Sequence, residues 1–223
     1  MASQIIDPKT PGSALLLDDI YKLRHTVFKE RLGWEVESEN GRERDQFDTA
    51  DAIFGALHSE EDGALEGCFR LLPTTGPNML ADVFAELLHG QPAPRDPRVL
   101  ESSRFAVLPS GWHHNSMRAL LIVTAELLIA QLNYCMERGI QVVVSVTDVR
   151  FERILRKSGL QCERFGPPLR IGCTLAVAGW LKATQENLDS VEATLYRLTA
   201  ARALMAETAI AAREVGVIDR PAP

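Results

Sequence analysis

A stretch in the middle of the chain combines the signature of a buried strand with side chains that could do acid–base chemistry. Residues 99–107 read Val-Leu-Glu-Ser-Ser-Arg-Phe-Ala-Val, so a carboxylate, two hydroxyls and a guanidinium lie between apolar ends. A central strand is normally apolar throughout, and burying an unpaired charge is costly. Glu101 could move a proton and Arg104 could hold a carboxylate, provided that partners or a substrate offset that cost.

Partners for these charges are offered by other segments of the first half. They are Arg24 with Phe28, Trp34, the pair Asp45 and Asp48, and Arg70. We expect the arginines of this set to balance Asp45, Asp48 and Glu101. Two interpretations stay open: a structural ion-pair network that pins residues 34–51 to the sheet, or the polar lining of a functional site, where such arrangements persist.

Side-chain alternation along the central strand complicates this grouping. A regular strand places Glu101, Ser103 and Phe105 on one face and Ser102 and Arg104 on the other. Arg104 can then join Glu101 only around an edge of the sheet or across a β-bulge. The sequence leaves both routes open.

A second group of charges lies on a short predicted helix after the next strand. Arg150, Arg153, Arg156 and Lys157 follow one another at spacings of three, three and one. Cations in a last helical turn complement the helix dipole, but a basic patch on an acidic protein can also steer an acidic partner. Both interpretations remain.

Composition limits the class of protein. The chain has 223 residues, 46% of them hydrophobic, and a net charge of −6, which is typical of a soluble protein and argues against a nucleic-acid partner. The cysteines form no regular framework, no secretory signal is visible, and the longest apolar stretch, residues 119–132, is too short for a bilayer. We expect a cytoplasmic protein with no membrane partner.

Other common chemistries find little support. His113 and His114 are adjacent and so point in different directions, and no third ligand stands at metal spacing, so no metal site is expected. The chain has no Gly-x-Ser-x-Gly, no P-loop and no Gly-x-Gly-x-x-Gly.

The elements that must position these residues form a mixed α/β pattern. We expect a single domain, residues 1–223, whose sheet is covered on both faces. The expected helices are residues 17–32, 79–88, 116–138, 148–158 and 185–216, and the expected strands are residues 52–58, 65–72, 99–107, 141–147 and 171–181. Residues 34–51 are expected to be a loop and residues 217–223 a frayed tail.

Several of these motifs, in this order, resemble the acyl-homoserine-lactone synthases of quorum sensing, the autoinducer synthase family. The resemblance runs from about residue 20 to residue 107. It rests on Arg24-x-x-x-Phe28, Leu32-Gly33-Trp34, Arg44-Asp45-Gln46-Phe47-Asp48, Gly67-Cys68-Phe69-Arg70-Leu71-Leu72-Pro73-Thr74, Met79-Leu80 with Phe84, and Glu101-Ser102-Ser103-Arg104-Phe105.

The resemblance implies an acetyltransferase-like (GNAT-like) α-β-α sandwich. The enzyme would join the amine of S-adenosylmethionine to an acyl thioester and then close the lactone, releasing 5′-methylthioadenosine. Glu101 would be the general base, with Ser103 and Arg104 beside it. S-adenosylmethionine would be bound through its carboxylate by Arg24 or Arg104, and otherwise by Phe28, Trp34, Asp45, Asp48 and Phe105, while Arg70 would be a structural ion-pair partner.

The resemblance also implies an apolar acyl pocket between the central strand, the strand that follows it and the long helix. Its lining would include Met79, Phe84, Val142, Val144 and Thr147. The turn after the central strand, residues 107–111, lacks the glycine-rich motif that holds coenzyme A in acetyltransferases. This favours an acyl carrier protein over acyl-coenzyme A as donor, docked on Arg150, Arg153, Arg156 and Lys157. No cofactor beyond the substrates is implied, and the oligomeric state is left open. The alternatives are an N-acyltransferase without lactonisation and a non-catalytic sensor.

Overall fold

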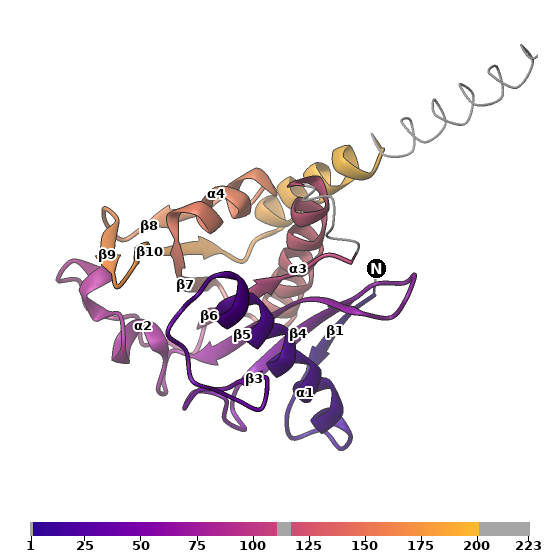
Figure 1. Cartoon of the computed structure of the whole chain (residues 1–223). Helices are drawn as coiled ribbons and strands as arrows, with labels where there is room; N and C mark the ends of the chain where they lie inside the picture. The colour runs from indigo at the N-terminus through magenta and orange to yellow at the C-terminus, as the bar shows by residue number, and fades with distance from the viewer. Residues whose placement is uncertain (1, 111–116, 201–223) are drawn as a thin grey trace, which may run out of the picture.

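One eight-stranded sheet runs through the molecule (Figure 1). The computed structural model describes residues 2–110 and 117–200. All neighbouring strands are antiparallel except β6 and β7, which are parallel. The strands in spatial order are β1 (Ala2–Ile6), β4 (Ile53–His58), β5 (Leu65–Pro73), β6 (Val99–Val107), β7 (Val142–Asp148), β10 (Thr174–Lys182) and β8 (Glu163–Arg164), and β9 (Leu169–Ile171) also pairs with β10.

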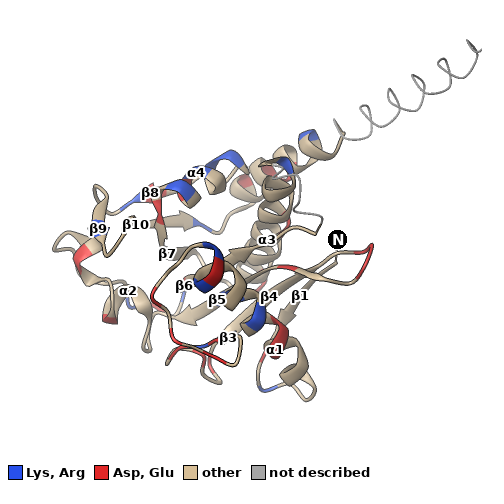
Figure 2. Cartoon of the chain, viewed as in Figure 1, with Lys and Arg blue, Asp and Glu red and all other residues tan. Residues whose placement is uncertain are grey.

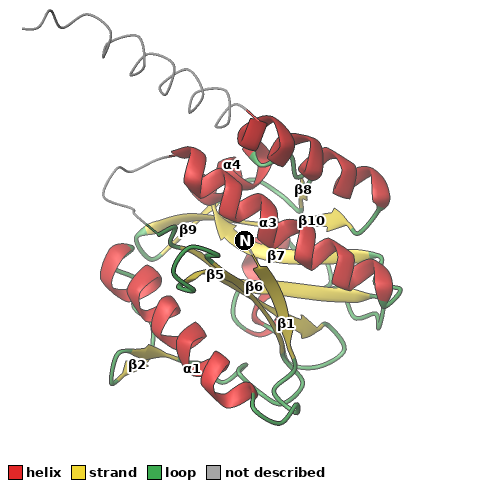
Figure 3. Cartoon of the chain, turned by 90° about the vertical axis from the view of Figure 1, so that its right-hand side faces the viewer, coloured by secondary structure: helices red, strands yellow, loops and turns green. Residues whose placement is uncertain are grey.

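Helices cover both faces of this sheet (Figure 3). Alternation along β5 explains why: Phe69 and Leu71 pack into the core beneath the long helix α3, whereas Cys68 and Leu72 pack on the opposite face. We call these the α3 face and the α1 face. The helices are α1 (Ser13–Arg24), which continues as the π-helix η1 (His25–Arg31), α2 (Met79–Asp82), the 3₁₀ helix η2 (Ala85–Leu88), α3 (Met117–Glu137), α4 (Val149–Lys157) and residues 185–200. The predicted mixed sheet is confirmed.

The long helix α3 is a core helix. Its 21 residues are long and apolar enough to cross a membrane by length and composition. The helix is thus longer than the apolar stretch of residues 119–132 that the sequence analysis considered too short for a bilayer. However, Val123, Leu127, Leu128 and Leu132 are buried against the sheet. Burial of this stripe accounts for its apolar composition.

Several predicted elements match the structure closely. The central strand is β6 with the predicted bounds, and the strands expected over residues 52–58, 65–72 and 141–147 are β4, β5 and β7. The C-terminal helix begins at residue 185 as predicted, and its expected continuation to residue 216 lies outside the described residues, as do His113 and His114.

Other elements differ for local reasons. The strand expected over residues 171–181 is the hairpin β9–β10, because Gly172 adopts φ 55° and turns the chain. The expected loop of residues 34–51 contains a small hairpin of β2 (Ser38–Glu39) and β3 (Arg42–Glu43) around Asn40-Gly41, both at positive φ. The helix expected over residues 79–88 is divided into α2 and η2, and β1 was not predicted.

A β-bulge in the central strand decides which side chains share a face. Cys68 pairs with Ala106 and Arg70 pairs with Ser103, so Phe69 alone opposes both Arg104 and Phe105. Arg104 takes up the extra residue with φ 52°. Arg104 therefore joins Ser103 on the α1 face, by the bulge route that the sequence had left open.

The same bulge moves Phe105 to the α3 face. Its ring lies 6.1 Å from that of Phe69 and 5.5 Å from that of Phe151 on α4. Regular alternation had placed Phe105 beside Glu101, in the expected S-adenosylmethionine site. That placement is wrong, because regular alternation does not continue through a bulge.

Candidate active site

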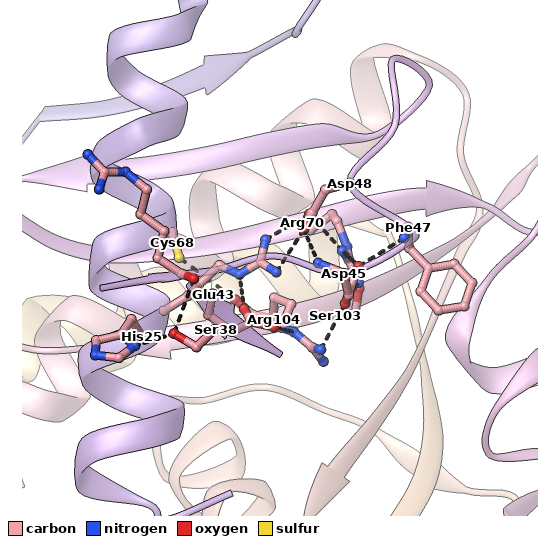
Figure 4. Close-up of polar contacts among 12 residues, drawn as sticks. His25, Ser38, Glu43, Asp45, Phe47, Asp48, Cys68, Arg70, Ser103 and Arg104 are labelled. Atoms are coloured by element: carbon pink, nitrogen blue, oxygen red, sulfur yellow. Dashed lines mark hydrogen bonds and ion pairs between the residues drawn. The ribbon is translucent and has the colours of Figure 1, made fainter. Parts of the chain in front are cut away.

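Three arginines and three carboxylates form a closed ring of ion pairs on the α1 face, part of which is drawn in Figure 4. Each carboxylate bridges two arginines, and each arginine contacts two carboxylates. Around the arginine–carboxylate ring the order is Arg24, Glu43, Arg104, Asp45, Arg70 and Asp48. Mutual pairing is what allows so many charges to be buried together.

The inner side of the ring is sealed from solvent. Arg24 donates from Nε to Glu43 Oε2 at 2.5 Å and from its two terminal nitrogens to Asp48 at 2.7 and 2.9 Å. All three side chains are 0% exposed. Burial alone would raise the pKa of Asp48, but Arg24 and Arg70 outweigh it and hold that pKa below its usual value. Asp48 therefore stays charged at neutral pH.

Arg70 connects the ring to the central strand. Its Nη1 lies 2.5 Å from Asp45 Oδ1 and 2.7 Å from Asp48 Oδ1, and its Nε donates to Ser103 Oγ at 3.1 Å. Ser103 and Arg70 are both buried. The expected ion pairs of Arg70 are present, and the Ser103 hydroxyl, expected beside the general base, supports this ring arginine.

The outer edge of the ring is formed by Arg104 and Asp45, whose side chains are each 13% exposed. Arg104 Nη2 lies 2.8 Å from Asp45 Oδ2, and its Nε donates to Glu43 Oε1 at 3.0 Å. The Arg104 guanidinium stands 5.7 Å from the centre of the Phe28 ring, and Trp34 stacks on Phe28 at 5.3 Å with an angle of 8°. An ion pair and an aromatic stack thus share one edge.

The acidic members of the ring are positioned by the segment between η1 and β4. Asp45 Oδ1 accepts from Phe47 N at 2.9 Å, and Asp48 Oδ2 accepts from Asp45 N at 2.8 Å, so the turn holds both carboxylates. The β2–β3 hairpin, which carries Glu43, is fastened to the first helix by the Arg42–Asp18 ion pair. The π-helical geometry of η1, a form often found at functional sites, carries Phe28.

Glu101 stands apart from the ring. Its Oε2 accepts from Met79 N at 2.7 Å and its Oε1 from Leu80 N at 3.0 Å, so it binds the start of α2. Burial raises the pKa of Glu101 to about 7, although these two backbone donors and the nearby arginines oppose the shift. A carboxyl that titrates near neutral pH is suited to moving a proton.

Of the residues expected to line an acyl pocket, Phe84, Val142 and Val144 lie together, but on the face opposite α3. Val142 and Val144 pack with Leu80 and Leu87 on the face covered by α2 and η2, where Phe84 also packs. By alternation along β7, Thr147 lies on the α3 face. Met79 contacts the ring, with its Sδ 3.4 Å from Arg104 Nη1. The expected pocket between β6, β7 and the long helix therefore cannot include Val142, Val144 and Phe84, which face away from α3.

The expected basic patch is present on α4 (Figure 2). Arg150, Arg153 and Lys157 are exposed. Arg156 is also exposed at the surface but bonds to Glu152 at 3.0 Å, and that carboxylate takes a second ion pair from Arg164. Arg156 thus has a structural partner.

Comparison with known proteins decides the family. The model of the family described as autoinducer synthase matches residues 12–191. The chain belongs to the autoinducer synthase family. An acyl-homoserine-lactone synthase of Pseudomonas aeruginosa is 40% identical over 164 residues, which is 73% of this chain and 80% of the relative. This autoinducer synthase is therefore an acyltransferase that makes acyl-homoserine lactones.

Solved structures agree with the family. The acyl-homoserine-lactone synthase LasI is 35% identical with a TM-score of 0.74, over 85% of this chain and 93% of LasI. TofI, solved in a ternary complex with an inhibitor and MTA, is 32% identical with a TM-score of 0.72, over 86% of this chain and 97% of TofI. A structure described as an N-acetyltransferase from Lactobacillus plantarum, at 18% identity and TM-score 0.52 over 82% of this chain and all of that one, shares the fold alone.

The site of this autoinducer synthase differs from the sequence prediction in one acid. Glu43, not Glu101, is the third carboxylate that balances the arginines. A signal was present, because Glu43 and Asp45 are two residues apart and can face the same way in extended chain. Among the residues that the structure describes, no cluster of three or more His, Cys, Asp or Glu is arranged to hold a metal.

Proposed function

We propose that this synthase transfers an acyl group from a thioester to the amine of S-adenosylmethionine and then closes the homoserine lactone. The observation that carries the proposal is the outer edge of the ring, where a cation and an anion stand side by side next to stacked aromatic rings. A methionine head presents the matching charges, a carboxylate and an amine. TofI, a relative solved with MTA, supports a nucleoside product at this fold.

Each part of S-adenosylmethionine has a partner at this edge. Arg104 binds the carboxylate, and Asp45 attracts the ammonium. The sulfonium and the adenine lie against Phe28 and Trp34, since aromatic faces attract cations and stack on bases. Arg24 and Asp48, which are sealed inside, hold the ring in place and do not touch the substrate.

The acyl donor enters between β6 and β7. The parallel ladder runs from Val99↔Val142 to Ser102↔Ser145, whereas β6 continues to Val107 and β7 to Asp148. The bulge at Arg104 lies just beyond the last pair. The arm that carries the acyl group of the donor is extended and contains amide groups. It can lie between the separated strands and form hydrogen bonds with their backbones, as an added strand does. We call this place the strand wedge.

The chemistry follows in two steps. The amine loses its proton to Glu101, directly or through water, and attacks the thioester carbonyl, so that the carbon–sulfur bond breaks and the thiol leaves with a proton. The methionine carboxylate then attacks its own γ-carbon, breaks the bond to the sulfonium sulfur and releases 5′-methylthioadenosine. Both steps use substrates alone, and Glu101 gains reach to the amine by releasing one of its backbone donors.

Two further features support a particular acyl donor and cellular compartment: the exposed cations of α4 and the free cysteine thiols. The exposed cations Arg150, Arg153 and Lys157 suit the acidic surface of an acyl carrier protein. Cys68, Cys135, Cys162 and Cys173 are free thiols, which supports a reducing cytoplasm.

Product analysis tests the proposal. The purified protein is incubated with S-adenosylmethionine and an acyl carrier protein loaded with a fatty acyl group, and the products are identified by mass spectrometry. We expect acyl-homoserine lactone and methylthioadenosine in equal amounts, lost in Arg104→Lys and retained in the control Arg98→Lys, an exposed arginine that pairs with Asp96. An acylated amine without methylthioadenosine would instead indicate a plain N-acyltransferase.

A further inference from the structure

Two carboxylates outside the ring of ion pairs stand at the open end of the strand wedge. We call this open end, where β6 ends at Val107 and β7 at Asp148, the mouth of the wedge. Glu66 lies on β5 beside the turn that follows β6 and is 5% exposed, and Asp148 is half-buried at the start of α4. Neither carboxylate forms an ion pair with a lysine or an arginine in the part of the chain that the structure describes.

The turn after β6 has its backbone donors occupied by Glu66. Leu108 N donates to Glu66 O at 2.7 Å, and Ser110 N donates to Glu66 Oε1 at 2.6 Å. Pro109, which lies between them, has no N–H to offer. Every backbone N–H of residues 108–110 is therefore accounted for. In a glycine-rich turn such donors hold a phosphate, whereas here a carboxylate of the protein itself accepts from one of them.

The start of α4, on the other side of the mouth, is occupied in the same way. Asp148 Oδ1 accepts from Arg150 N at 2.7 Å and from Phe151 N at 2.9 Å. The N-terminus of a helix attracts anions because its first N–H groups have no partner within the helix. At α4 an internal carboxylate already takes two of these donors.

The two kinds of acyl donor differ at the end of the arm that would reach the mouth. Beyond its last pair with β7, β6 extends from Ser102 to Val107, five residues or about 15 Å. An arm that lies in the wedge with its thioester near the ring therefore has its phosphate end near the mouth. On an acyl carrier protein that end is one phosphodiester, whereas coenzyme A carries a pyrophosphate and a third phosphate. The coenzyme thus brings more negative charge towards the two carboxylates.

We propose that Glu66 and Asp148 are specificity residues that disfavour acyl-coenzyme A as the donor. This inference rests on the proposed function. The two carboxylates occupy backbone donors that would otherwise hold a pyrophosphate, and they place two negative charges where its phosphates would lie. The phosphodiester of an acyl carrier protein is repelled less, and contacts between the two proteins on α4 offset that repulsion.

The test compares acyl-pantetheine, acyl-phosphopantetheine and acyl-coenzyme A, which carry the same acyl group and increasing negative charge. The kcat/KM for each is measured by methylthioadenosine release in the wild type, Glu66→Gln and Asp148→Asn. Each variant removes one charge but keeps an oxygen that accepts the backbone N–H, and asparagine is also a good N-cap. We expect the ratio of kcat/KM for acyl-coenzyme A over acyl-pantetheine to rise by about tenfold in each variant, and less at high salt. Acyl-phosphopantetheine should show a smaller rise.

Asp7→Asn is the matched control. Its carboxylate also accepts a backbone N–H, from Lys9 at 2.8 Å, but it follows β1 at the far edge of the sheet. Its ratio should stay within about twofold of the wild type, since charges far apart are screened. If both mouth variants leave the ratio unchanged, or change all three donors equally, the carboxylates do not select the donor. A wild type that makes no lactone from any donor, acyl carrier protein included, would instead overturn the proposed function.

Inhibition of the wild type gives a second measure that needs no variant. Free pantetheine and free coenzyme A both compete with the acyl donor for the wedge. We expect coenzyme A to inhibit no more strongly than pantetheine, because its phosphates gain no backbone donor at the mouth. Stronger inhibition by coenzyme A would contradict the proposal. If Glu66→Gln fails to fold, as thermal unfolding would show, Asp148→Asn and this comparison decide the outcome.

Discussion

Arg104 Nη2 lies 2.8 Å from Asp45 Oδ2, and this ion pair is where solvent reaches an otherwise buried ring of charges. The pair can exist only because Arg104 adopts φ 52° at a bulge and leaves the alternation of its strand. Its two charges are the ones that a methionine head would meet first. Each side of the pair can be tested separately.

Asp45→Asn should weaken binding of S-adenosylmethionine. The variant keeps the shape but removes the anion that attracts the amine, so we expect the KM for S-adenosylmethionine to rise by at least about tenfold, as for one charge-assisted hydrogen bond. Steady-state kinetics with saturating acyl donor measures it. The control is Asp51→Asn in the same segment, whose carboxylate pairs with the exposed Lys9. A rise in the donor KM alone would contradict the assignment.

Glu43→Gln should lower the free energy of unfolding. Glu43 is 0% exposed and bridges Arg24 and Arg104, so its loss leaves each of these two guanidinium groups with a single carboxylate partner. We expect a decrease of about 3 kcal/mol or more, measured by urea unfolding. The control Asp18→Asn removes an ion pair with Arg42 that water screens, and should cost much less. Equal losses in the two variants would show that the ring contributes little to stability.

Activity should depend on the ionisation of Glu101. Because the pKa of this carboxyl is raised to about 7, the base form is gained as pH rises through about 7. We expect kcat/KM to increase with pH up to that point in the wild type. Glu101→Gln should lose most activity and this pH dependence together. A variant with normal rates and the same profile would show that another group accepts the proton.

The same residue should affect the pH dependence of stability in the opposite sense. The folded protein binds a proton at Glu101 more tightly than the unfolded chain does, between the unfolded value of 4.5 and the folded value of about 7. Stability therefore falls as pH rises through that range. Urea unfolding at several pH values should show this decline in the wild type and less of it in Glu101→Gln.

The aromatic stack should contribute to nucleoside binding. Trp34→Ala removes the face stacked on Phe28, and we expect the KM for S-adenosylmethionine to rise by about tenfold, whereas Trp34→Phe should restore most of the affinity. Trp180→Phe, on the half-buried strand β10, is the control. The tryptophan fluorescence of the wild type is compared with that of Trp34→Phe to isolate the signal of Trp34. If that signal does not change when methylthioadenosine is added, Trp34 does not contact the nucleoside.

Charge reversal on α4 should distinguish the acyl donors. Arg153→Glu should raise the KM for acyl carrier protein substrates several-fold, and more at low salt, with little effect on acyl-coenzyme A. Arg153 is preferred to Arg156, which also bonds to Glu152. Arg170→Glu, an exposed cation on β9, is the control. Equal effects of Arg153→Glu on both donors would remove the docking proposal.

Much of the fold was predictable because its signals are local. The apolar run predicts β7, and periodicity with turn residues predicts the hairpin β4–β5 and the strand β6. The set of arginines was also predictable, since Arg24, Arg70 and Arg104 each interrupt an apolar pattern. Asn40-Gly41 was a hairpin signal of the same kind that the sequence prediction did not use.

The rest depended on tertiary structure. The bulge at Arg104 is set by pairing with β5, and no residue type in β6 announces it. Consequently, the face of Phe105 could not be deduced from alternation. The spacing of Glu43 from Asp45 was a weak signal, but its role also depends on a contact with Arg24, which lies nineteen residues earlier in the chain.

Because of the bulge, the two faces of β6 carry side chains of different kinds on the α1 face and the α3 face. Ser103 and Arg104 face the ring of ion pairs on the α1 face, whereas Ser102 and Phe105 lie on the α3 face. Under the proposed function, substitutions beneath α3 can therefore alter which fatty acid is used without touching the ring that is proposed to bind S-adenosylmethionine. A lineage of such enzymes can diversify its signals while its common substrate stays the same.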